Sequence, residues 1–153
     1  MLKWHWRTFE ALTTDELYEI LKARQAVFGL EQNCLYQDID DLDRFAWHLF
    51  AELAEDEPPR QIQAYLRVVH PGRKYDEPSI GRVLTATQSR GKGVGKLLMD
   101  KGIAHVKEAF PDQPIRISAQ QYLETFYSGF DFKAVSAPYL EDGIPHIEML
   151  RTV

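Results

Sequence analysis

The sequence predicts a single domain of the α/β or α+β class, with about seven strands and about four helices. Its 153 residues are enough for one ordinary domain and leave little room for a second, so we treat residues 1–153 as one unit. With 44% hydrophobic and 27% charged residues, the chain has enough apolar side chains to bury a core. Segments with two-residue alternation are separated by segments with helical spacing, and no internal repeat is present.

The first strand and the first helix are predicted from alternation and from capping. Residues 3–9 read as a strand, because two tryptophans alternate with other residue types. Thr13 or Thr14 then caps a helix, and Glu16 stands in capping-box spacing from Thr13. The buried stripe of this helix recurs with helical spacing at Leu17, Ile20, Leu21, Arg24, Val27 and Phe28. We expect the helix to end at Gly29.

Strands and helices alternate through the rest of the chain. Further strands are expected at residues 48–53, 62–68, 79–85, 115–119, 132–135 and 146–151. One helix should run from the glycines near residue 94 to about Phe110, with apolar residues on one side and charged residues on the other. A short helix is expected at residues 122–130. The acidic stretch between residues 31 and 43 has no firm pattern and predicts a solvated loop or a short helix beside a cleft.

Composition and charge exclude several classes of function. The net charge of −5 disfavours a general grip on nucleic acid, so no such partner is expected. Cys34 is the single cysteine, which excludes an internal disulfide and a multi-cysteine metal site; we expect no metal. The first residues lack the apolar stretch of a signal peptide, and no segment is long enough to span a bilayer. These observations favour a soluble cytoplasmic protein with no membrane partner.

A glycine-rich turn, Arg90-Gly91-Lys92-Gly93-Val94-Gly95, joins a predicted strand to a predicted helix. The first N–H groups of a helix have no internal partner, and the helix dipole places partial positive charge there. Glycines let the backbone come close to phosphate oxygens. Arg90, Lys92 and Lys96 add positive charge around these N–H groups. The turn therefore predicts a site for a polyanion such as a pyrophosphate.

Two nucleotide-binding motifs can be tested by spacing. A nucleoside-triphosphate loop needs four residues between its glycines and a hydroxyl residue after its lysine, whereas Gly91 and Gly95 have three residues between them and Leu97 follows Lys96. A dinucleotide fingerprint has a different glycine period and lies near the first strand. Both fail. A turn that merely opens a helix remains the alternative without a ligand.

What remains is the pattern R-x-x-G-x-G, with Arg90, Gly93 and Gly95 in the fixed positions. It resembles the coenzyme A loop of the GNAT N-acetyltransferases, which lies between the fourth strand and the third helix. A second family pattern resembles Ala119 followed by Phe126-Tyr127-Ser128-Gly129-Phe130, although Asp131 stands where a glycine is usual. The resemblance is stronger to the ElaA-like branch. The segments that carry it are residues 24–28, 31–32, 36–37, 48–49, 80–83, 118–120 and 139–146, with Asp40.

The resemblance implies a fold, a co-substrate and a reaction. The fold would be a mixed, mostly antiparallel twisted sheet whose fourth and fifth strands splay apart. The co-substrate would be acetyl-CoA, with its acetyl group passing to a primary amine of a small molecule or peptide by direct attack on the thioester. The residues implied in binding it are Val83, Leu84, Thr85, Arg90, Gly91, Lys92, Gly93, Val94, Gly95, Lys96 and Tyr127. A backbone N–H of Val83 or Leu84 would stabilise the oxyanion, and Tyr127 would act as general acid.

The general base is left open by the sequence. A lysine-like amine has a pKa near 10.4 and is mostly protonated at neutral pH, so a base must remove its proton. Glu31 is the first candidate, His48 the second and His146 the third. The protein would be a monomer or a homodimer. The alternative function is a catalytically weak sensor that binds acyl-CoA.

Overall fold

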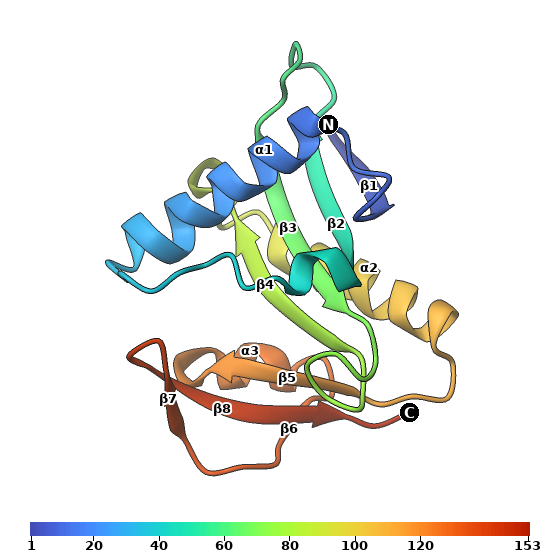
Figure 1. Ribbon diagram of the computed structural model, residues 1–153, viewed down its shortest axis with the longest axis vertical. Coiled ribbons are helices and arrows are strands. Elements are labelled where there is room, and N and C mark those ends of the chain that lie inside the picture. Colours follow the sequence, from blue (N-terminus) through green and yellow to red (C-terminus); the bar gives the residue numbers. More distant parts are fainter.

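The computed structural model describes all of residues 1–153 and contains two antiparallel sheets (Figure 1). The first sheet has the order β1 (Leu2–Thr8), β2 (Ala46–Leu53), β3 (Ile62–Val69) and β4 (Ser79–Thr85). In the second, β8 (Ile144–Arg151) pairs with β5 (Ile115–Gln120), β6 (Lys133–Ala134) and β7 (Tyr139–Glu141). The predicted α/β class is confirmed. The chain has eight strands, one more than the sequence predicted.

The three α-helices are α1 (Thr14–Arg24), α2 (Val94–Ala109) and α3 (Glu124–Ser128). α1 and α2 cover opposite faces of the first sheet (Figure 1). All eight residues of β3 are consequently buried, although its sequence alternates as a half-exposed strand would. The capping box of α1 is present: the Glu16 N–H donates to Thr13 Oγ1 (3.0 Å), and the Thr13 N–H donates to Glu16 Oε1 (2.9 Å).

Gly29 does not end the first helix, which corrects the sequence-based expectation. A π-helical turn, Gln25–Glu31, follows α1 directly and includes Gly29. A glycine ends a helix by adopting a positive φ, and here Asn33 has that conformation instead, with φ of 50°. The turn carries the chain to Glu31, at the mouth of the cavity described below.

The strand that the sequence analysis missed is β7, which forms a hairpin with β8. Glu141 pairs with Ile144, so Asp142 and Gly143 make a two-residue turn. Their φ values of 52° and 74° are those of the hairpin turn that an Asp-Gly pair favours. The Asp-Gly dipeptide was therefore an available signal. Tyr139 lies opposite His146 in the register of this hairpin.

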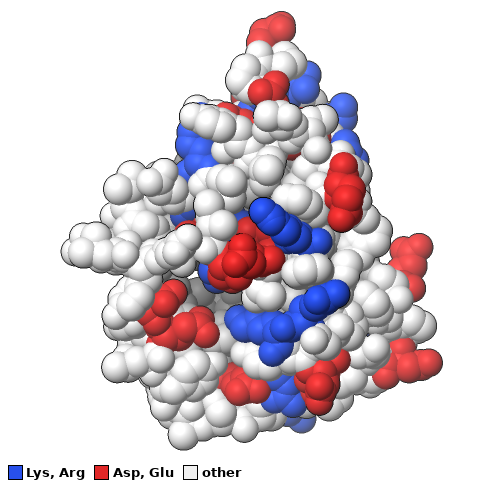
Figure 2. All heavy atoms as spheres, in the orientation of Figure 1, with Lys and Arg blue, Asp and Glu red and all other residues white.

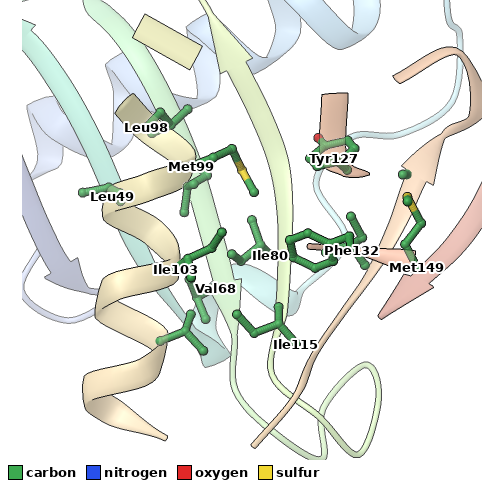
Figure 3. Packing of buried hydrophobic residues seen from close by; sticks show 14 of the residues in the cluster. Leu49, Val68, Ile80, Leu98, Met99, Ile103, Ile115, Tyr127, Phe132 and Met149 are labelled. Carbon is green, nitrogen blue, oxygen red and sulfur yellow. The ribbon is translucent and has the colours of Figure 1, made fainter. Parts of the chain in front are cut away.

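The two sheets touch at one end and separate at the other. The Arg116 N–H of β5 donates to the Pro78 carbonyl just before β4 (3.1 Å), but β4 and β5 share no ladder. Both strands run away from this contact and diverge (Figure 1). Figure 3 shows the core that joins the sheets, from Leu98, Met99 and Ile103 of α2 past Ile80 to Phe132 and Met149. The diverging ends of β4 and β5 are left free to line a cavity.

Candidate functional site

A cavity of about 400 Å³ lies where β4 and β5 diverge. Val83, Leu84 and Thr85 of β4 line one side, and Ile117, Ser118 and Gln120 of β5 line the other. Tyr127 of α3 and the β7–β8 hairpin complete it on the side of the second sheet, and residues 31–38 complete it on the side of α1. β4 is the outer strand of its sheet, so the edge that faces β5 has no ladder partner.

A β-bulge shapes β4 beside the cavity. Gly81 pairs with Arg67 and Leu84 with Tyr65, so Arg82 and Val83 together stand opposite Leu66. Arg82 has φ of 52°, which is uncommon for a residue with a side chain. A bulge bends its strand and turns backbone groups away from the ladder. The predicted oxyanion donors, Val83 and Leu84, therefore lie at and directly after the irregularity in β4.

The glycine-rich turn has the conformation expected of an anion site. Gly91 and Gly93 have φ of 76° and 78°, where a side chain would be strained. Gly93 is the N-cap of the 16-residue α2, and no side chain caps this end, which leaves its first N–H groups available. Gly95 places the start of α2 close to the end of β4, because a Cβ there would lie 3.8 Å from Thr85 Cγ2.

Two of the three basic residues near this turn are already paired with carboxylates. Arg90 binds Glu31 through both terminal nitrogens, at 2.6 and 3.0 Å, and its Nε donates to the Thr85 carbonyl (3.1 Å). Lys96 pairs with Asp100 at 3.2 Å. Lys92 has no ion pair and is exposed. The positive charge of the turn therefore comes chiefly from Lys92 and the helix end.

Glu31 occupies the Arg90 guanidinium, which a pyrophosphate on this turn would otherwise contact. We expect Glu31→Gln to free Arg90 and tighten coenzyme A binding by roughly 1.5- to 5-fold, the range for an exposed ion pair. Titration calorimetry with coenzyme A measures this, and Glu10→Gln on the N-terminal loop is the control. Weaker binding by Glu31→Gln would show that Glu31 supports the site.

Tyr127 lies at the floor of the cavity with 7% of its surface exposed. Its ring packs edge-on against Phe126 and Phe132, with centroids 5.1 and 6.2 Å away; Figure 3 shows Tyr127 beside Phe132. Its hydroxyl has no hydrogen-bond partner in the protein and borders the cavity. Burial raises the pKa of Tyr127, so the phenol stays protonated and can donate a hydrogen bond at neutral pH.

The three candidate bases occupy different places. Glu31 lines the cavity, but the hydrogen bonds from Arg90 lower the pKa of its carboxyl, which makes it a weaker base. His48 is fully buried outside the cavity, with Nδ1 2.7 Å from the Tyr65 hydroxyl and Nε2 2.9 Å from the Asp43 carbonyl. Burial lowers the pKa of His48. The structure therefore does not bring His48 together with Tyr127 and β4.

His146, the third candidate, lines the cavity. Its Nδ1 lies 2.7 Å from the Ile144 carbonyl, so Nδ1 carries the hydrogen and a neutral ring has its lone pair on Nε2. Nε2 faces Glu141 Oε2 at 3.4 Å, and Ser118 Oγ donates to Glu141 Oε1 at 3.2 Å. Glu141 was not among the site residues predicted from the sequence. The Asp-Gly turn would have placed it beside His146.

The acidic stretch is not a solvated loop, because three of its carboxylates pair with three arginines from distant elements. Arg24 contacts Asp43 (2.7 Å), Arg67 contacts Asp40 (2.6 Å), and Arg82 contacts Asp38 (2.8 Å). Burial alone would raise the pKa of Asp40, but hydrogen bonds from Arg67 outweigh it and hold the pKa well below its usual range. These six residues, which we call the Arg–Asp cluster, fasten residues 38–43 to α1, β3 and the β4 bulge.

The surface around the cavity carries both signs of charge. Figure 2 shows acidic and basic residues side by side on this face, with no extended region of one sign. No helix is long and apolar enough to cross a membrane. No three histidine, cysteine, aspartate or glutamate side chains are grouped to hold a metal ion.

Comparison with known proteins identifies the family. Residues 61–153 match the family model of the acetyltransferase (GNAT) domain. The chain belongs to the GNAT acetyltransferases. The glycine-rich turn at residues 90–95 and the diverging strands β4 and β5 all lie within the matched residues.

Similarity over the whole length places this GNAT domain in the ElaA-like branch. Protein ElaA of Escherichia coli is 39% identical over 100% of this chain and 98% of its own, and its crystal structure superposes with a TM-score of 0.89. UPF0039 protein sll0451 of Synechocystis is 40% identical over 97% of this chain and 94% of its own. An acyl-CoA N-acyltransferase from Pseudomonas aeruginosa has a TM-score of 0.91 at 38% identity, covering 99% of this chain and 100% of its own.

Proposed function

We propose that this protein transfers an acetyl group from acetyl-CoA to a primary amine by direct attack on the thioester. The observation behind the proposal is that one cavity borders the β4 bulge, Tyr127 and His146, and lies beside the start of α2. The name of the Pseudomonas relative, an acyl-CoA N-acyltransferase, is consistent with this reaction class.

The chain offers complementary groups for each part of acetyl-CoA. The backbone N–H groups of residues 91–95 and the ammonium of Lys92 would hold the pyrophosphate. The unpaired edge of β4 at Val83, Leu84 and Thr85 would bind the pantetheine arm as an added strand. Bound there, acetyl-CoA supplies the activated carbonyl.

The reacting groups would then be handled by residues on three elements. A backbone N–H of Val83 or Leu84 stabilises negative charge on the carbonyl oxygen. His146 Nε2 takes the proton of the attacking amine, and the Glu141 carboxylate stabilises the imidazolium that forms. The Tyr127 hydroxyl donates to the departing sulfur. Glu31 is the second choice for the base, since Arg90 must release it first.

Tyr127 gives a direct test of the thiol-leaving step. We expect Tyr127→Phe to lower kcat by about 10- to 100-fold, the value of one hydrogen bond to a charged group, and to leave coenzyme A affinity unchanged. Release of free coenzyme A thiol with a panel of amines measures kcat. Tyr18→Phe, on the exposed side of α1 and outside the cavity, is the control. An unchanged kcat would remove Tyr127 from the reaction, whereas tight coenzyme A binding with no turnover of any amine would favour the sensor.

A further inference from the structure

The charges that face the cavity are almost all paired within the protein. Arg90 is bound to Glu31. Arg67 and Arg82 belong to the Arg–Asp cluster, in which three guanidinium groups meet three carboxylates and leave no net charge. Such pairs have little attraction left for a substrate. A charge without a partner in this cavity is therefore informative about what the cavity binds.

Lys74 is the positive charge in this cavity that has no ion-pair partner. It lies between β3 and β4, is partly buried and lines the cavity, yet no carboxylate is in ion-pair contact with its ammonium. The centre of the Tyr75 ring lies 5.5 Å from its Nζ. Burial lowers the pKa of Lys74, and the nearby positive charges of Arg67 and Arg82 lower it further, against the opposing effects of Glu141 and Asp40. The ammonium is thus held in a position that a bound anion would stabilise.

The β7–β8 hairpin supplies the groups that would bind a positively charged amine. His146 and Glu141 line the same cavity and present a proton acceptor and a carboxylate, the groups that suit an ammonium or amine. Among acidic residues, Glu141 has the largest effect on the pKa of Lys74, so the two sites lie within electrostatic reach of each other. Asp142 of the same hairpin also lines the cavity, so Lys74, which has no ion pair, stands against a group of acidic side chains on the hairpin.

From this geometry we propose that Lys74 binds a carboxylate of the acceptor, and that the acceptor is a small zwitterion of the amino-acid class. Its amino group faces His146 and Glu141, where it is acetylated, and its carboxylate forms an ion pair with Lys74. This inference rests on the proposed acetyl transfer for the fate of the amine, but the Lys74 contact itself requires only binding.

The test compares each amino acid with the amine that differs from it only by lacking the carboxylate. The pairs are lysine and cadaverine, phenylalanine and phenethylamine, and histidine and histamine, and the other common amino acids are screened alongside. Titration calorimetry on the full-length protein saturated with coenzyme A measures binding. We expect the preferred amino acid to bind about 10- to 100-fold more tightly than the same amine without its carboxylate, as for one charge-assisted bond. Lys74→Met should abolish this preference, Lys74→Arg should keep it, and Lys133→Met should behave as wild type.

Several outcomes would overturn the proposal. These are the absence of amino-acid binding, equal binding of both members of each pair, or a preference that survives in Lys74→Met. An equal loss of kcat for both members in Lys74→Met without rescue by Lys74→Arg would instead identify Lys74 as a proton carrier. Amines that turn over without any carboxylate preference would leave the acetyl transfer standing and refute the Lys74 site. Binding of amino acids through Lys74 without thiol release would support the site and refute the transfer.

Discussion

Replacing His146 by glutamine is expected to lower kcat/KM at pH 7 by about 100- to 10,000-fold, the usual contribution of a general base. Glutamine keeps a polar side chain of similar length but has no basic nitrogen for the amine proton. Steady-state rates of thiol release at pH 7 measure this effect.

Two controls separate catalysis from folding in this prediction. His105→Gln changes a histidine that stacks on Trp6 with centroids 4.2 Å apart, outside the cavity, and should keep full activity. Glu141→Gln should have an intermediate effect, because it weakens stabilisation of the imidazolium and keeps the base. A wild-type rate for His146→Gln would return the role of base to Glu31.

Removing the Asp43 charge is expected to be the most destabilising single change in the Arg–Asp cluster. Asp43 Oδ1 accepts from Arg24 (2.7 Å) and from Arg67 (3.0 Å), and these arginines are only 0% and 1% exposed. Asp43→Asn removes the negative charge that the two buried guanidinium groups share. This loss should lower the free energy of unfolding by about 3–5 kcal/mol. Urea unfolding at pH 7 measures this as a lower midpoint with an unchanged slope.

The neighbouring Asp41 is the matched control, because it is exposed and has no ion pair. Asp41→Asn should leave the midpoint unchanged. The pH dependence has a definite sign: the pKa of Asp43 is lowered, because Arg24 and Arg67 outweigh its burial. Its contribution is therefore present above the unfolded-state pKa, near 4, and is lost as the pH falls through the folded-state value. Equal midpoints for Asp43→Asn and wild type would show that the cluster contributes no net stability.

Features that depend on neighbours in sequence were predictable. The capping box of α1 involves Thr13 and Glu16 alone, and it formed as expected. The glycine-rich turn is also local, since the positive φ values of Gly91 and Gly93 and the start of α2 follow from residues 90–95. The β7–β8 hairpin was local too, and its Asp-Gly turn was overlooked.

Features that depend on distant residues were not predictable in this way. Nothing near Asp38 or Asp43 in the sequence indicates that Arg24, Arg67 and Arg82 converge on them from α1, β3 and β4. His48 and His146 are the same residue type on two strands, yet one is enclosed by Tyr65 and the other borders the cavity. Burial of this kind arises from packing between elements, so residue type alone could not rank the candidate bases.

A crystal structure of the protein with coenzyme A is the most direct test of the cavity as an acetyl-transfer site. We expect the pyrophosphate on the backbone N–H groups of residues 91–95, the pantetheine arm along Val83 to Thr85, and the sulfur within hydrogen-bond reach of the Tyr127 hydroxyl. Coenzyme A bound elsewhere, or its sulfur directed away from both Tyr127 and His146, would contradict this assignment.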